Sequence, residues 1–263
     1  MTDSIKIKLD LSNVPKEDLK HVPVPVVLRM DRTKPMAPVI PFAAYQSWKS
    51  PLTRNPMMIK VLVTPIAFDP AALVADINVP NATVGQNAEL GHSVYAASTV
   101  SLELFKVFLA EHCVPLESLN LLTVNDLGLG SVTITYLVPA LTDHRNAQAC
   151  IEAIEHRFTH FFPQSDYKIK DGKKRYGGGG EGSKGSRLAY CIQRGWSVRV
   201  YSTPAHKIPG DDGPVRDDRI KFAQSMIRIE LTLTLEELRI YGWCSACQWR
   251  QRSYATARKE LRW

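Results

Sequence analysis

Tyr201 is the residue whose type and setting best suit nucleophilic chemistry in this chain. In Trp196–Ser202, apolar residues alternate with Ser197, Arg199 and Tyr201, which predicts that Tyr201 ends a strand on its polar face, beside Arg199. A tyrosine hydroxyl can attack a phosphodiester when a metal or basic groups polarise the phosphate. The alternative is an ordinary aromatic residue of a sheet, and the nine tyrosines of the chain keep that alternative open.

Glu230 is the second candidate, within the alternating segment Met226–Leu233. There the polar residues Arg228, Glu230 and Thr232 share one face of the expected strand. A carboxylate on the second face of a central strand needs either a cationic partner or a divalent metal. Arg228 could be that partner, or it could contact phosphate, so the pattern leaves an ion pair and a metal site both open.

A basic, glycine-rich segment lies between Lys168 and Arg187. It holds seven basic and two acidic residues, a balance of +5 within a total of +7. The run Gly177–Gly180 lacks the Gly-Lys-Ser/Thr ending of a Walker loop. Such a segment suits a polyanion, with nucleic acid first and a membrane surface second, while a solvated loop is the plain alternative. The residues expected to contact DNA are Lys173, Lys174, Arg175, Lys184 and Arg187, with Tyr176 available to stack on a base.

Two further pairs have the spacing of metal ligands. His156 and His160 lie four residues apart on an expected helix, but no third ligand is evident, which favours surface histidines. Cys244 and Cys247 form a CxxC without a second pair, which favours packing over zinc.

The five cysteines form no disulfide framework and no signal peptide is expected, so the sequence indicates a reducing cytoplasm. No apolar run approaches the roughly 20 residues of a membrane span.

The elements that would position these residues follow an α+β pattern. Ten of the 17 prolines fall between Pro15 and Pro70, so we expect residues 1–57 to form an extended arm with short edge strands. The order of the remaining elements predicts a mostly antiparallel sheet covered by helices on one face. The expected strands are Met58–Val63, Ser131–Val138, Arg187–Gln193, Trp196–Ser202 and Met226–Leu233; the expected helices are Ser98–Cys113, capped by Ser98, Asp143–Phe162, and one that a Thr234–Glu237 capping box opens.

Four segments, in order, resemble the replication initiators of filamentous phages, the gene II protein family, which is similar to plasmid rolling-circle initiators. They are Ile59–Val63 with Thr64–Pro65, the segment Gly91–Tyr95 (GHSVY), the strand Trp196–Ser202, and the segment Ile227–Leu238 (IRIELTLTLEEL). The resemblance implies a DNA-nicking and DNA-binding domain over residues 58–263, of the HUH-like type found in rolling-circle enzymes.

The resemblance also implies an activity, a cofactor and partners. Tyr201 matches the nucleophile that nicks one strand of origin DNA, keeps the 5′ phosphate and later rejoins the strand. Glu230 matches an acidic position that would hold Mg²⁺ or Mn²⁺, and Arg199 and Arg228 would contact DNA. Partners would be single- and double-stranded origin DNA and the host replication machinery in a bacterial cytoplasm, without a membrane.

Several positions depart from the family pattern. The Arg-x-Asp strand of the family matches Ser131 and Thr133, so an aspartate that helps to hold the metal is missing unless Asp126 replaces it. The lysine and glutamate that follow the nucleophile match Thr203 and His206. These departures support an alternative function, a DNA-binding protein of the same fold that does not cut.

Overall fold

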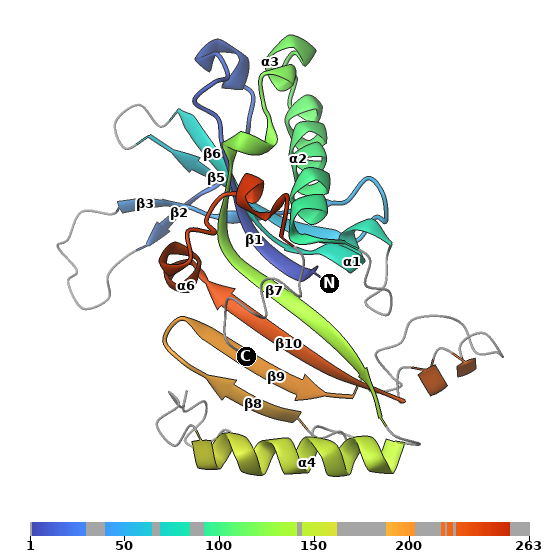
Figure 1. Ribbon diagram of the computed structural model, residues 1–263. Helices are drawn as coiled ribbons and strands as arrows, with labels where there is room; N and C mark the ends of the chain where they lie inside the picture. The colour runs from blue at the N-terminus through green and yellow to red at the C-terminus, as the bar shows by residue number, and fades with distance from the viewer. Residues whose placement is uncertain are drawn as a thin grey trace. The chain divides into compact units, whose positions relative to one another are not determined.

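A computed structural model describes residues 2–29, 40–64, 69–84, 92–140, 144–161, 188–202, 217–218, 220–222 and 225–252. The chain is an α+β protein with a large antiparallel sheet and a few helices, as expected (Figure 1). Among the helices in these ranges, none has both the length and the apolar character needed to cross a membrane.

The strands, in chain order, are β1 (Thr2–Asp10), β2 (Val26–Arg29), β3 (Ile40–Ala43), β4 (Tyr45–Lys49), β5 (Pro56–Val63), β6 (Pro70–Asn78), β7 (Leu127–Pro139), β8 (Leu188–Ile192), β9 (Trp196–Tyr201) and β10 (Met226–Thr234). The helices are α1 (Val79–Thr83), α2 (Val94–Glu111), α3 (Leu116–Asn120), α4 (His144–Phe161) and α6 (Leu235–Ile240). Short 3₁₀ turns lie at Lys16–Leu19, Val124–Asp126 and Ala246–Trp249.

The chain divides into two compact units, which are described separately. Unit 1 holds the start of β1 up to Asp3, β7 from Ser131 onward, and the elements from α4 to α6. Unit 2 holds β1 from Ser4 onward, the elements from β2 to α3, the start of β7, and the segment after Gly242. The sequence predicts a different division, by function, into an arm at residues 1–57 and a nicking domain at residues 58–263, and this division stays a prediction.

Unit 1 is built on the strand order β7-β10-β9-β8, with β10 antiparallel to both of its neighbours. One side of these strands is apolar, and Val198, Val200 and Leu231 are buried there. Helix α4 packs against β8, β9 and β10 and buries Ala147 and Ile151. The opposite side carries the polar residues of β7, β9 and β10, and the candidate site lies there.

Unit 2 is built on the strand order β4-β5-β6-β1, with the start of β7 next to β1. The alternating pattern of β1 buries Ile5, Ile7 and Leu9 on one face of the sheet. Trp48 of β4 packs edge-on against Phe108 of α2 with a centroid distance of 5.8 Å. Helix α2 therefore contributes to the core of this unit, and the other face of the sheet carries polar residues.

Three local expectations differ from the structure. The expectation of short edge strands before residue 58 is wrong for β1. This strand has nine residues and lies between β6 and β7 in the sheet, because its alternating apolar residues are buried on one side. Helix α2 begins at Val94 with Ser93 as its cap, whereas Ser98 is buried inside the helix and donates to the Val94 carbonyl. Thr234 is the N-cap residue of α6, as expected, but its side chain makes no capping hydrogen bond, and its hydroxyl donates to the Gly195 carbonyl at 2.9 Å.

Candidate functional site

The register of β9 and β10 brings the two leading candidates onto one face. Arg228 lies opposite Tyr201, and Glu230 lies opposite Arg199. Residues directly opposite each other in an antiparallel pair project from the same face of the sheet. Tyr201 and Glu230, each expected on the polar face of its own strand, therefore project from the same face of the sheet.

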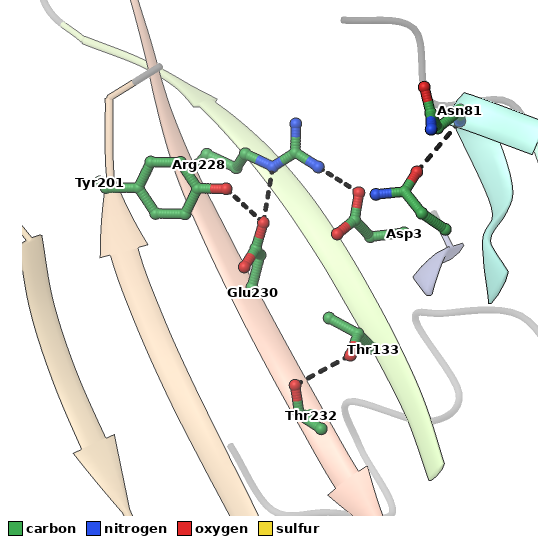
Figure 2. A network of polar contacts seen from close by, with 8 residues as sticks. Asp3, Asn81, Thr133, Tyr201, Arg228, Glu230 and Thr232 are labelled. Atoms are coloured by element: carbon green, nitrogen blue, oxygen red, sulfur yellow. Dashed lines mark hydrogen bonds and ion pairs between the residues drawn. The ribbon is translucent and has the colours of Figure 1, made fainter. Parts of the chain in front are cut away.

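Four side chains on this face form one hydrogen-bonded network, shown in Figure 2. The Tyr201 hydroxyl donates to Glu230 Oε1, and the same oxygen accepts from Arg228 Nε at 2.9 Å. Arg228 Nη2 forms a further hydrogen-bonded ion pair with Asp3 Oδ1. Of the two possibilities left open for Glu230, the structure shows the ion pair with Arg228.

The charged members of the network are buried. Arg228 is 5% exposed, Glu230 7% and Asp3 8%. Buried charges are costly unless they are paired and hydrogen-bonded, and here a single guanidinium bridges two carboxylates. Burial raises the pKa of the Asp3 carboxyl, although Arg228 beside it acts in the opposite direction.

Tyr201 is half-buried and holds its proton firmly. Burial raises the pKa of its hydroxyl well above the usual range; Arg228 opposes this shift, and the hydrogen bond to Glu230 adds to it. The hydroxyl is therefore protonated at neutral pH and needs a base before it can attack as an oxyanion. The acceptor already in contact is Glu230, whose carboxylate accepts the hydrogen bond of the hydroxyl and is therefore placed as a candidate general base.

Asp3 is a site residue that the sequence analysis missed. The resemblance places Thr133 where the family has an aspartate, which left Asp126 as the expected second carboxylate beside Glu230. Thr133 instead shares a hydrogen bond of 2.9 Å with Thr232, its register partner on β10 (Figure 2). Asp126 accepts from Thr123 and from Asn13 within unit 2. The second carboxylate of the network is Asp3, at the start of a strand that was interpreted as part of an arm.

The residues of this network do not fit a resident divalent ion. A metal bound by Glu230 would lie next to the Arg228 guanidinium, which already forms ion pairs with both Glu230 and Asp3 and would repel a cation. The described ranges contain no group of three or more His, Cys, Asp or Glu side chains with the geometry of a metal site. The Mg²⁺ or Mn²⁺ requirement stays a prediction.

The other residues expected to take part in the site either lie apart from this network or fall outside the residues that the structure describes. Arg199 has an exposed side chain on the same face of the sheet as Tyr201. His156 is exposed on α4, and Cys247 donates to Asn125 Oδ1 at 2.8 Å. Ser131 lies opposite Thr234 in the β7–β10 pair. The residues that fall outside the described ranges are Lys173, Lys174, Arg175, Tyr176, Lys184, Arg187, Thr203 and His206.

Comparison with known proteins gives no match: no family model, no curated protein and no solved structure is similar to the chain. The resemblance to phage replication initiators therefore stays a prediction.

Proposed function

We propose that the chain is a rolling-circle replication initiator with an HUH-like nicking domain, which binds origin DNA, nicks one strand through Tyr201 and rejoins it. The observation that carries the proposal is the contact between the Tyr201 hydroxyl and the Glu230 carboxylate. A nucleophile in hydrogen-bond contact with a base, itself oriented by a third group, is a common arrangement in covalent catalysis. Here the third group is Arg228, which Asp3 holds in turn.

In the proposed reaction the Tyr201 oxygen attacks the phosphorus of a phosphodiester. Glu230 accepts the phenolic proton as the new oxygen–phosphorus bond forms. The bond from phosphorus to the 3′ oxygen breaks, and that oxygen leaves and takes up a proton from solvent. The product is a 5′-phosphotyrosine linkage with a free 3′ hydroxyl that can prime synthesis. Rejoining is the reverse: a 3′ hydroxyl attacks the phosphorus and loses its proton to solvent, the bond from phosphorus to the Tyr201 oxygen breaks, and Glu230 returns its proton to that oxygen.

The two arginines have different proposed roles. Arg199 is exposed on the same face as Tyr201, so its guanidinium is available to the substrate phosphate. Arg228 is buried against Glu230 and Asp3 and is hydrogen-bonded to both, so it acts by fixing the position of the base. We therefore assign DNA contact to Arg199 and positioning to Arg228.

A second candidate function is DNA binding without cleavage. The observation that favours it is the burial of the network: Glu230 and Arg228 are 7% and 5% exposed, which suits a purely structural ion pair as well as a catalytic one. In that case Arg199 and the basic segment would contact DNA, and Tyr201 would only pack and donate its hydrogen bond.

A nicking assay separates the two candidates. Supercoiled plasmid and single-stranded DNA are incubated with the protein in Mg²⁺, in Mn²⁺ and in EDTA, and adducts that survive detergent are counted. Tyr201→Phe keeps the ring and removes the nucleophile, and Tyr95→Phe, at a half-buried tyrosine of α2, is the matched control. The proposal expects adducts with the control and none with Tyr201→Phe. DNA binding without any adduct, in every metal condition, supports the second candidate.

A further inference from the structure

The sheet of unit 2 has an open face that carries lysines in register. Lys8 of β1 lies opposite Val74 of β6, Val74 lies opposite Lys60 of β5, and Lys60 lies opposite Tyr45 of β4. The next row begins with Lys6, which lies opposite Asp76. Because residues opposite each other share a face, these side chains lie on one surface, which we call the lysine face.

The lysine face is the polar side of a sheet whose other side is the core. Lys6 and Lys8 alternate along β1 with Ile5, Ile7 and Leu9, which are buried. Lys6, Lys8 and Tyr45 are exposed, and Tyr45 keeps 41% of its surface accessible. On the adjoining strand β7, Gly130 lies beside this row of lysines, since a Cβ there would come within 3.4 Å of Lys6 Cγ, and the glycine leaves that space unfilled. A glycine within a strand often marks a place where a ligand or another backbone approaches closely.

The charges of this face are not cancelled within it. Across the four strands it carries Lys6, Lys8, Lys49 and Lys60 against Asp10 and Asp76, four positive charges and two negative ones. Among the described residues, Lys6, Lys8 and Lys60 form no ion pair. The Lys60 ammonium lies 5.8 Å from the centre of the Tyr45 ring, so a cation and an aromatic face are presented together.

We infer that the lysine face binds single-stranded nucleic acid, with the lysines on backbone phosphates and Tyr45 stacked on a base. Strands about 4.8 Å apart, with residues of one face about 6.6 Å apart along each strand, present these groups as a flat grid. A flat cationic grid with an aromatic ring matches a splayed single strand, whose bases are free to stack, better than a closed duplex. The surface is distinct from the Tyr201 network and does not depend on the nicking proposal.

The test is the binding of a fluorescein-labelled oligothymidylate in EDTA, followed by anisotropy at several salt concentrations. The protein carries Tyr201→Phe throughout, so that cleavage cannot contribute. One variant changes Lys6, Lys8 and Lys60 to Gln. The matched control changes three lysines exposed elsewhere and removes the same charge: Lys16, Lys20 and Lys221.

We expect the lysine-face variant to bind more weakly than the control and to lower the log–log salt slope by about 2, since each contact with single-stranded nucleic acid contributes about 0.7. Tyr45→Ala should weaken binding about fivefold or more while Tyr45→Phe, which keeps the ring, should not. The inference is overturned if both triple variants bind alike, or if anionic phospholipid vesicles, and not the oligonucleotide, show the difference.

Discussion

Replacing Arg228 with Met should destabilise unit 1 strongly, because it leaves two buried carboxylates without their cation. Arg228 is hydrogen-bonded to both Glu230 and Asp3, and its side chain is 6% exposed. Removing one partner from a buried ion pair costs about 3–5 kcal/mol. For a chain of this size about 1 kcal/mol corresponds to roughly 2–4 °C in Tm, so we expect a loss of about 6–20 °C.

The loss should depend on pH in a defined direction. The pKa of Asp3 is already raised by burial, and removing Arg228 takes away the charge that opposes this shift. A carboxyl whose pKa is higher in the folded than in the unfolded state stabilises the fold below its unfolded pKa, and this contribution is lost as the pH rises through the folded pKa. The Arg228→Met defect should therefore be larger at neutral pH than at mildly acidic pH.

Thermal unfolding followed by circular dichroism at both pH values measures these effects. Arg194→Met is the matched control in the same unit, since the Arg194 side chain is 87% exposed and pairs with Glu236 at the surface. A surface pair of this kind is worth about 1 kcal/mol or less. If Arg228→Met is no more destabilising than Arg194→Met, or if its defect grows toward acidic pH, the interpretation of the network as a buried ion cluster is wrong.

Three further predictions concern the site and the basic segment. Glu230→Gln should keep the fold and lower nicking by about 10²–10⁴-fold in a plasmid assay, because the near-isosteric amide cannot accept the phenolic proton; an active variant would exclude Glu230 as the base. Because burial raises the pKa of Tyr201, part of the tyrosine ionisation in an ultraviolet titration should appear only when the protein unfolds at alkaline pH, and Tyr201→Phe should reduce that part by one tyrosine. Neutralising Lys173, Lys174 and Arg175 together should lower the salt slope of DNA binding by about two to three, and an unchanged slope would mean that the segment makes no phosphate contact.

The face shared by Tyr201 and Glu230 could be predicted because it follows from local alternation. In β9 and β10 every second residue is apolar, and a strand with this period has only one way to bury those residues. The hairpin at Arg194–Gly195 then fixes which residues of β8 and β9 lie opposite each other. The strand and helix segments expected after residue 130 are found for the same reason, within a few residues at their ends.

Asp3 could not be predicted because its role depends on a contact between residues 225 positions apart. Nothing in the first residues of the chain indicates that a strand there reaches the Arg228 guanidinium. The cap expected at Ser98 failed because α2 already begins at Val94, and at Thr234 the side chain makes no capping hydrogen bond while its hydroxyl donates to an acceptor outside the helix. For Thr234 that acceptor is the carbonyl of Gly195, in the turn between two other strands.

Mapping the covalent protein–DNA adduct by mass spectrometry tests the proposed activity most directly. After incubation with single-stranded DNA and with supercoiled plasmid, the protein is digested with nuclease and protease, and peptides that carry a residual nucleotide are sequenced. The proposed reaction places the nucleotide on Tyr201, through its 5′ phosphate. A nucleotide on any other tyrosine, such as Tyr176 or Tyr254, would contradict the assignment of Tyr201 as the nucleophile.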